Sequence, residues 1–312
     1  MVTGGAGFIG SNLARELLSR PEVDHVIAFD DLSTGRRENL DGTDAELVEA
    51  TILDPAALDR ALAGARAVVH LAALPSVPRS VLDPVASHHA NATGTLEVLQ
   101  AARRAGNIPV VVASSSSVYG ANRELPKRES MRTAPISPYA VSKQATEAYA
   151  LSFGHTYGLP TLAFRFFNVY GPLQPAGHAY AAVMPAFVDA ALRGVPLTVH
   201  GDGEQTRDFT FIGNVVAGNL LAAEAPAEQV AGRVFNLAAG QRTSLNELVS
   251  YLQEILDCQV QPVHTDPRPG DIKHSWADVD RARAHLGYEP QVGFLEGLRR
   301  TVAWYRAGDG RS

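Results

Sequence analysis

The sequence predicts an α/β protein whose core is a doubly wound parallel sheet. Three observations indicate this fold class. Short apolar segments of strand length alternate with helical segments through the first 170 residues. One of these strands, residues 109–113, is apolar throughout, as a strand covered by helices on both faces should be. The first strand runs directly into a glycine-rich turn, which a helix follows.

The glycine-rich turn spans residues 3–10 and contains Gly4, Gly7 and Gly10 at three-residue spacing, with Gly5 offering a second register. Such a turn has no room for a Cβ atom, because its backbone N–H groups must approach a pyrophosphate closely. The helix expected over residues 11–20 adds unsatisfied donors and the positive end of its dipole. We therefore expect a Rossmann-type sheet that binds a dinucleotide at Gly4, Gly7, Phe8, Ile9 and Gly10.

A second strand, residues 25–29, ends at Asp30, twenty residues after Gly10. An acid at this spacing accepts hydrogen bonds from the ribose hydroxyls of the adenosine and repels a 2′-phosphate. The sequence therefore predicts NAD rather than NADP, although an ordinary turn with a helix-capping Asp would have the same pattern. The following loop could run along the adenosine, through Asp31, Ser33, Thr34 and Gly35.

Composition narrows the functional classes. The 312 residues are 46% hydrophobic without an apolar run of eighteen, so we expect no membrane span and, with folding starting near residue 1, no signal peptide. A net charge of −6 argues against nucleic acid as a partner. The single cysteine, Cys258, excludes an internal disulfide and fits the cytoplasm, and the ten histidines form no metal-binding pattern.

Further segments continue the alternation after Asp30. In order, they are strand 46–50, helix 55–63, strand 67–73, helix 85–105 and strand 109–113. Strand 67–73 ends in Ala72 and Ala73, whose small side chains either leave room for a flat cofactor or simply allow close packing. The last strand ends in a run of four serines, residues 114–117, and ligands of such sheets bind beyond the carboxyl ends of the strands.

Tyr139 and Lys143 lie four residues apart on a helix expected over residues 137–155, so they share one face. With Ser115 at the strand end, they suit removal of a hydroxyl proton while a hydride passes to NAD. Free tyrosine has a pKa of about 10, and acting as a base near neutral pH requires lowering it by about 2–3 units. We expect the Lys143 ammonium and the nicotinamide cation to lower it. An incidental Tyr–Lys pair is the plainer alternative, which the glycine turn and the serine run disfavour.

The second half of the chain is less periodic. Its expected elements are strand 161–166, helix 184–192, strand 197–200, strand 234–237, helix 244–256 and helix 294–305. We therefore predict an NAD-binding domain at residues 1–170, to which segments near 207–240 return. A smaller α/β substrate domain is expected at residues 171–312.

The chain resembles the extended short-chain dehydrogenase/reductase family, and within it the UDP-sugar 4-epimerases. The resemblance runs nearly from end to end. It rests on the glycine turn, on Tyr139 with Lys143, and on residues 70–73 (HLAA), 91, 94–95, 114–120, 165–172, 201–203 (GDG), 207–209 (RDF) and 268–271 (RPGD).

The resemblance implies a role for each matching residue. Tyr139 matches the catalytic base, Lys143 its activator and nicotinamide-ribose ligand, and Ser115 the catalytic serine. The further cofactor contacts that it implies are Thr51, Ile52, Leu71, Ala72, Ala73, Asn91, Ser114 and Phe166. The substrate contacts are Ser76, Arg79, Ser116, Ser117, Asn168, Ala182, Val183, Thr198, His200, Arg207, Arg268, Asp271 and Ser275, with Asn168, Arg207 and Arg268 on the diphosphate. Thr51 is a departure, because many relatives carry there an Asp that contacts adenine.

The reaction that the resemblance implies is 4-epimerisation of a UDP-hexose, by hydride removal at C4, a 4-keto intermediate and hydride return to the other face. Relatives that dehydrate or decarboxylate the sugar carry acids where this chain has Ser116 and Ser117, whose hydroxyls cannot do that proton transfer at neutral pH. One alternative is a nucleotide-sugar dehydrogenase or reductase, which would exchange its cofactor. Another is an NAD-sensing binding protein, which need not keep Tyr139, Lys143 and Ser115 together.

The identity of the sugar is open between UDP-glucose with UDP-galactose, UDP-glucuronate and UDP-N-acetylglucosamine. Arg79 could contact a C6 carboxylate or merely hold a loop. The resemblance implies that Ser275 stands at a sugar-pocket position where a bulky aromatic limits relatives to plain hexoses, so we expect a modified sugar to fit as well. UDP-glucuronate is favoured if Arg79 reaches the site. The resemblance also implies a homodimer, formed through the helices at 85–105 and 137–155.

Overall fold

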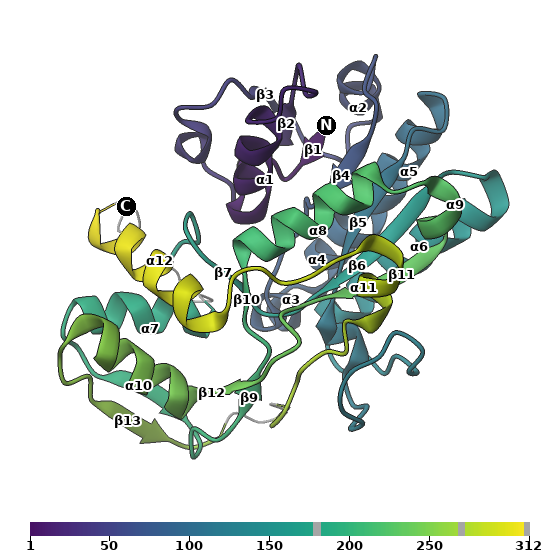
Figure 1. Ribbon diagram of the computed structural model, residues 1–312. Coiled ribbons are helices and arrows are strands. Elements are labelled where there is room, and N and C mark those ends of the chain that lie inside the picture. Colours follow the sequence, from purple (N-terminus) through teal and green to yellow (C-terminus); the bar gives the residue numbers. More distant parts are fainter. Residues whose placement is uncertain (177–181, 268–271, 309–312) are drawn as a thin grey trace.

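The computed structural model describes residues 1–176, 182–267 and 272–308 (Figure 1). Its centre is a seven-stranded parallel sheet in the order β11-β6-β5-β4-β1-β2-β3. The strands are β1 (Val2–Thr3), β2 (Ile27–Asp30), β3 (Glu46–Glu49), β4 (Val68–His70), β5 (Val110–Ser115), β6 (Thr161–Phe166) and β11 (Arg233–Leu237). The predicted doubly wound parallel sheet of the Rossmann type is therefore confirmed.

The strand order reverses between β1 and β4. The chain builds outward from β1 to β3 and then returns to add β4, β5 and β6 on the other side. Connections from neighbouring strands diverge at such a point and leave a crevice at the carboxyl ends. The glycine turn leaves β1 here, and the loop after His70 leaves β4.

Strand ends differ slightly from those expected. β5 is buried along its whole length and extends through Ser115, because its pairing with β6 continues as far as Phe166. The first two serines of the run therefore belong to the strand itself. β4 instead ends at His70, so residues 71–73, expected in the strand, form a loop.

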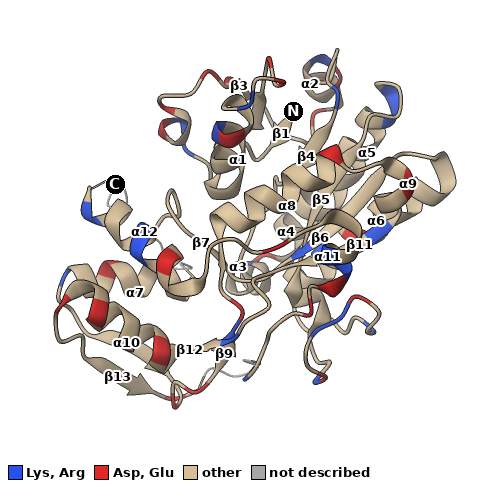
Figure 2. Ribbon diagram, in the orientation of Figure 1, with Lys and Arg blue, Asp and Glu red and all other residues tan. Residues whose placement is uncertain are grey.

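Helices cover both faces of the sheet. α1 (Phe8–Leu18) packs against α8 (Ile212–Glu224), while α5 (Gly94–Arg104) packs against α2 (Pro55–Ala61) and α6 (Pro138–Tyr157). Figure 1 shows α8 crossing in front of the sheet. Figure 2 shows α8 almost without charged residues, as expected for a helix that is buried over most of its length.

The helix predicted over residues 85–105 is divided into three parts. α4 (Pro84–His88) is followed by a π-helical turn (His89–Thr93) and then by α5. The carbonyl oxygen of Asn91 accepts hydrogen bonds from the hydroxyls of Thr95 and Thr146, at 2.5 and 2.9 Å. Hydroxyl donors of this kind compete with the helical N–H for the carbonyl, which explains the wider turn.

The other elements lie mostly in the second half of the chain. They are α3 (Val77–Leu82), β7 (Val169–Tyr170), α7 (Val183–Leu192), β8 (Leu197–His200), β9 (Thr206–Arg207), β10 (Thr210–Phe211), α9 (Ala227–Val230), β12 (Thr243–Ser244), α10 (Leu245–Leu256), β13 (Pro262–Thr265), α11 (Asp280–Leu286) and α12 (Phe294–Arg306). α7, α10 and α12 pack against one another, and β8 pairs with β13 beside them.

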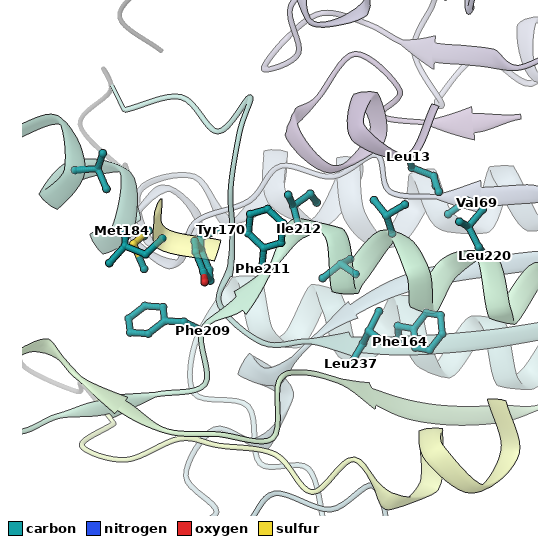
Figure 3. Close-up of a cluster of buried hydrophobic side chains, with 14 of the residues drawn as sticks. Leu13, Val69, Phe164, Tyr170, Met184, Phe209, Phe211, Ile212, Leu220 and Leu237 are labelled. Carbon is teal, nitrogen blue, oxygen red and sulfur yellow. The ribbon is translucent and has the colours of Figure 1, made fainter. Parts of the chain in front are cut away.

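A buried hydrophobic cluster joins the sheet to this second group of elements (Figure 3). Leu13 of α1 and Phe164 of β6 belong to its part between the sheet and the helices α1 and α8, whereas Tyr170, Phe209 and Met184 lie toward α7. Tyr170 also donates a hydrogen bond to the carbonyl oxygen of Phe294, at 2.9 Å. The shared core positions the second group against the carboxyl ends of the strands, while the domain boundary at residue 170 stays a prediction.

Candidate active site

A cavity of about 1230 Å³ lies where the crevice meets the second group of elements. Its described lining contains most of the residues predicted to bind the cofactor: Gly4, Gly7, Phe8, Ile9, Gly10, Asp30, Asp31, Ser33, Thr34, Thr51, Ile52, Leu71, Ala72, Ala73, Ser114, Tyr139, Lys143 and Phe166. It also contains six predicted substrate residues besides Tyr139: Ser76, Arg79, Ser115, Asn168, Ala182 and Val183. The fold thus brings the glycine turn, the serine run and the Tyr–Lys pair to one place.

The glycine turn allows a close approach of the backbone. Gly4 has a φ of +67°, and a Cβ there would lie 2.8 Å from the backbone nitrogen of Ala72. A Cβ on Gly10 would overlap the carbonyl oxygen of Gly4. Gly7 is the N-cap of α1 and offers no capping side chain, so the first turn of the helix presents its N–H groups at the cavity. This donor set fits the pyrophosphate of a dinucleotide.

Asp30 ends β2 and is 7% exposed. Its carboxylate accepts hydrogen bonds from the N–H groups of Ala6, at 3.0 Å, and Leu32, at 2.9 Å. Burial raises the pKa of Asp30, and these two bonds lower it. The carboxylate is therefore held beside the glycine turn, where it suits the adenosine ribose of NAD. Gly35 packs against it, because a Cβ on Gly35 would lie 2.8 Å from Oδ1 of Asp30.

Tyr139, Ser115 and Lys143 meet in the cavity. The phenol of Tyr139 lies near enough to Ser115 for that hydroxyl to lower its pKa, and Oγ of Ser115 donates to Oγ of Ser117 at 3.1 Å. Lys143 lies one turn further along α6 and is 5% exposed. Its Nζ donates to the carbonyl oxygen of Ala113 at 2.8 Å. The shared helical face is thus directed at the end of β5.

Burial shifts the pKa values of both Tyr139 and Lys143. Burial raises the pKa of the Tyr139 phenol, and the hydrogen bond to Ser115 opposes this effect. Burial lowers the pKa of Lys143 to about 8. The expected lowering of the Tyr139 pKa by Lys143 and the nicotinamide cation concerns the cofactor-bound protein and stays a prediction. In the chain by itself, burial is the largest effect on this pKa, and Nζ of Lys143 is bonded to Ala113.

A buried ion pair lies behind the serine run. Arg165 of β6 and Glu147 of α6 form two hydrogen bonds, at 2.6 and 2.9 Å, and both side chains are less than a tenth exposed. Ser114 donates to the same carboxylate at 2.9 Å. The ion pair therefore holds α6 against β6, and the bond from Ser114 holds it against β5, one helical turn after Lys143.

Four predicted residues from the sheet half lie outside the described lining of the cavity: Gly35, Asn91, Ser116 and Ser117. Asn91 is 1% exposed, and its side chain holds the loop after β4 instead of facing the cavity. Ser116 and Ser117 begin a 3-10 helix (Ser116–Tyr119), which changes the chain direction directly after β5. For these residues, a direct ligand contact has no support from the described lining.

Of the predicted substrate residues in the second half of the chain, some line the described cavity and others do not. Thr198, His200, Arg207 and Ser275 also lie outside the described lining. The backbones of these segments are paired locally, since the N–H of Ser275 donates to the carbonyl of Thr206, at 3.1 Å, and β8 pairs with β13. The view that Ser275 widens the sugar pocket therefore lacks support in the described cavity. Arg268 and Asp271 fall outside the described residues.

The cavity contains other residues to which the sequence assigned no ligand contact. Leu173, Gln174 and Pro175 follow β7, and further contributions come from His89, Met184, Phe209 and Trp304. Trp304 belongs to α12, far from every recognised motif in the sequence. In the sequence, Trp304 is recognisable only as part of an amphipathic helix, a pattern that predicts packing against the core rather than contact with a ligand.

Metal-binding clusters and membrane-spanning helices can be sought among the described residues. No three histidine, cysteine or acidic side chains in residues 1–176, 182–267 and 272–308 are grouped as metal ligands would be. Within the same ranges, no helix combines the length and the apolarity needed to cross a bilayer.

Comparisons with known proteins agree with this geometry. Residues 1–238 match the NAD dependent epimerase/dehydratase family. The UDP-glucose 4-epimerase of Mycolicibacterium smegmatis is 40% identical, over 98% of both chains. A probable UDP-glucuronate 4-epimerase of Rhizobium meliloti is 33% identical, over 98% of this chain and 96% of its own.

A solved structure extends the comparison to three dimensions. It is the UDP-N-acetylglucosamine 4-epimerase of Methanobrevibacter ruminantium M1, in complex with UDP-N-acetylmuramic acid. The two chains are 38% identical and align with a TM-score of 0.92, over 98% of this chain and 97% of that one. The predicted cofactor, NAD, is the one that the family description names. This chain belongs to the NAD dependent epimerase/dehydratase family.

Proposed function

We propose that this protein is a UDP-hexose 4-epimerase, and thus an isomerase. The observation that carries the proposal is that Tyr139, Lys143 and Ser115 line the same cavity as the glycine turn and Asp30. The glycine turn and Asp30 would hold NAD, which would supply reversible acceptance of the C4 hydride of the sugar. The names of the relatives support this reaction class for three different UDP-sugars.

The side chains of the cavity suit movement of the C4 hydroxyl proton. Tyr139 takes this proton, directly or through the hydroxyl of Ser115, and gives it back when the alcohol re-forms. Because burial raises the pKa of Tyr139, the phenolate needs a cation nearby. An ammonium has three donors, and Lys143 uses one of them on Ala113, so the others can hold ligand hydroxyls.

Chemistry at C5 and C6 is not supported. Dehydration needs an acid and a base at these carbons, and the positions that would supply them hold Ser116 and Ser117. Neither serine belongs to the described lining of the cavity. Epimerisation at C4 therefore fits this site better than dehydration or decarboxylation.

The proposed substrates are UDP-glucose and UDP-galactose, together with UDP-glucuronate. The cavity lining includes Arg79, whose forked guanidinium matches a C6 carboxylate. UDP-N-acetylglucosamine is a second candidate, because the small side chain of Ala182 lines the same cavity and leaves room for an acetamido group.

The test is an assay of the purified protein with the three UDP-sugars, followed by NMR of the C4 epimers and by measurement of protein-bound NAD. We expect interconversion of epimers with the cofactor retained. Net production of NADH would indicate a dehydrogenase instead. Binding of NAD without turnover of any of the three sugars would indicate a binding protein.

We also propose that two copies of the chain associate through α3, α4 and α6, which contact one another. Four large apolar side chains on these helices are strongly exposed: Val81 (63%), Leu82 (73%), Val85 (63%) and Val141 (53%). A group of this kind on one surface is typical of a protein–protein interface. A self-complementary interface would cover it in a symmetric dimer.

A further inference from the structure

The backbone of Tyr139 is connected to the segment between β4 and α4, directly through its N–H and indirectly through its carbonyl oxygen. Tyr139 is the second residue of α6, after Pro138. Its N–H group has no helical acceptor at this position, because the first turn of a helix leaves such groups unpaired. The N-cap hydroxyl of Ser137 is already bonded to the N–H of Ala140. The acceptor is instead Oγ of Ser80, at 3.0 Å.

Ser80 is completely buried, and its hydroxyl accepts one hydrogen bond and donates another. It accepts the N–H of Tyr139 and donates its own proton to the carbonyl oxygen of Val77, at 2.7 Å. Val77 begins α3, whose N-cap is Ser76 and whose third residue is Arg79. The hydroxyl of Ser80 therefore joins α3 directly to the residue that carries the phenol.

The other end of the same residue is joined to the loop by a longer chain of bonds. Ser142 donates to the carbonyl oxygen of Tyr139 at 2.8 Å and accepts a bond from Nδ2 of Asn91 at 2.9 Å. The Oδ1 atom of Asn91 accepts the N–H of Leu74, at 2.7 Å. Leu74 and Ser80 thus flank Ser76 and are both tied to one residue of α6.

The segment between these two anchors is held in an unusual conformation. Ser76 has a φ of +97°, in a region that side chains other than glycine rarely adopt. Such a conformation persists only where the surrounding structure determines it. Both Ser76 and Arg79 line the cavity, as does Tyr139. The strained segment and the phenol therefore share one set of buried anchors.

We propose that Ser80 is a positioning residue that couples the Ser76–Arg79 segment to Tyr139, so that sugar contacts on the segment set the alignment of the phenol. The proposal rests on the function proposed above. It requires Ser80 to affect the chemical step and not the cofactor, because Ser80 contacts neither the glycine turn nor Asp30 in the described bonding pattern.

The test compares Ser80→Ala with Ser87→Ala in the NAD-loaded enzyme. Ser87 is a matched control, because it is equally buried, lies on the neighbouring α4 and donates to the carbonyl of Asp83 at 3.1 Å. It makes no described bond to α6. Small displacements of a reacting group are costly, so we expect Ser80→Ala to lower kcat by about tenfold or more, with KM changed by less than about threefold. Ser87→Ala should stay within about twofold of wild type in both constants.

Three readouts separate positioning from general damage. Ser80→Ala should retain full NAD content, and deuterium at C4 of the substrate should slow it more than wild type, because hydride transfer becomes more rate-limiting. Exchange of the Tyr139 amide hydrogen should also become faster. A Ser80→Ala enzyme with the kcat and isotope effect of Ser87→Ala would overturn the proposal.

A second variant covers the case in which Ser80→Ala does not fold. Ser80→Cys keeps the shape but replaces the hydroxyl by a weak acceptor, so kcat should fall to a value between those of wild type and an unanchored enzyme. A Ser80→Cys enzyme with wild-type kcat and isotope effect would refute the coupling. Wild-type protein without epimerase activity would instead refute the proposed function, so the two failures are distinguishable.

Discussion

The Nζ atom of Lys143 lies 2.8 Å from the carbonyl oxygen of Ala113, two residues before Ser115 on β5. The lysine is thus buried as a charged group against a strand, and burial lowers its pKa from 10.5 to about 8. Holding a cation here destabilises the folded chain, and it leaves the ammonium donors facing the cavity. A site of this kind gives up stability for reactivity.

We expect Lys143→Met to raise the free energy of unfolding of cofactor-free protein at pH 7. The lowered pKa corresponds to a penalty of about 3 kcal/mol, from which the lost bond to Ala113 subtracts about 1 kcal/mol. Below pH 8 both states are protonated, and the penalty is complete. Between pH 8 and 10.5 the unfolded state binds more protons, so the stability of wild type rises with pH and the advantage of the variant shrinks. Urea denaturation at pH 7, 9 and 10.5 measures this, and an advantage that grows with pH would contradict it.

Tyr139→Phe should abolish turnover and leave NAD bound. In the proposed mechanism the phenol is the proton acceptor, whereas the glycine turn and Asp30 would make the cofactor contacts. We expect kcat to fall by about a thousandfold, in the range typical for removal of a general base. The readouts are the rate of epimer formation and the NAD content of the purified variant. Activity within about tenfold of wild type would rule out the assigned role.

Arg165→Met should destabilise the protein strongly, because it leaves the buried carboxylate of Glu147 without its partner. Removal of one member of a buried pair costs about 3–5 kcal/mol. Arg300→Met breaks an exposed pair with Glu296 and is the matched control, with an expected loss below about 1 kcal/mol. Adding Glu147→Gln to Arg165→Met should recover part of the loss, because the unpaired charge is removed. Equal stability of the two single variants would contradict this assignment.

Leu82→Asp should convert the proposed dimer to monomers. Leu82 is the most exposed of the four apolar side chains on α3, α4 and α6, and a charge there would be buried without a partner in a symmetric interface. Light scattering should give about twice the 33.2 kDa chain mass for wild type and the single-chain mass for the variant. Val195→Asp is the control, since Val195 is 39% exposed and lies after α7, outside these three helices. A wild-type protein that is monomeric at micromolar concentration would refute the dimer.

Much of the fold was predictable because most strands and helices are indicated by the residues of their own segment. β6 and β8 have the bounds that periodicity predicts, and Tyr139 and Lys143 share a face because the spacing of an α-helix requires it. The glycine turn is equally local, since its three glycines and the following helix stand in one segment.

Other parts of the site depend on contacts between distant segments, which a single sequence does not contain. The family resemblance predicts that Asn91 contacts the cofactor, but its side-chain amide instead accepts a hydrogen bond from Leu74 and donates one to Ser142. Trp304 reaches the cavity from α12, which packs on α7, and no local signal marks it. The raised pKa of Tyr139 follows from burial, which spacing does not reveal.

The last prediction concerns the choice of sugar and rests on Arg79. This side chain is partly buried and lines the cavity, and a guanidinium pairs strongly with a carboxylate. Arg79→Met keeps much of the apolar stem but removes the charge. We expect it to lower kcat/KM for UDP-glucuronate by about 30-fold or more, as for the loss of a charged hydrogen-bonded pair, and that for UDP-glucose by less than about threefold. Arg123→Met removes an exposed arginine outside the described lining and should change neither value. Equal losses for both sugars in Arg79→Met would show that the arginine holds the loop, and that the carboxylate of the substrate is bound elsewhere or not at all.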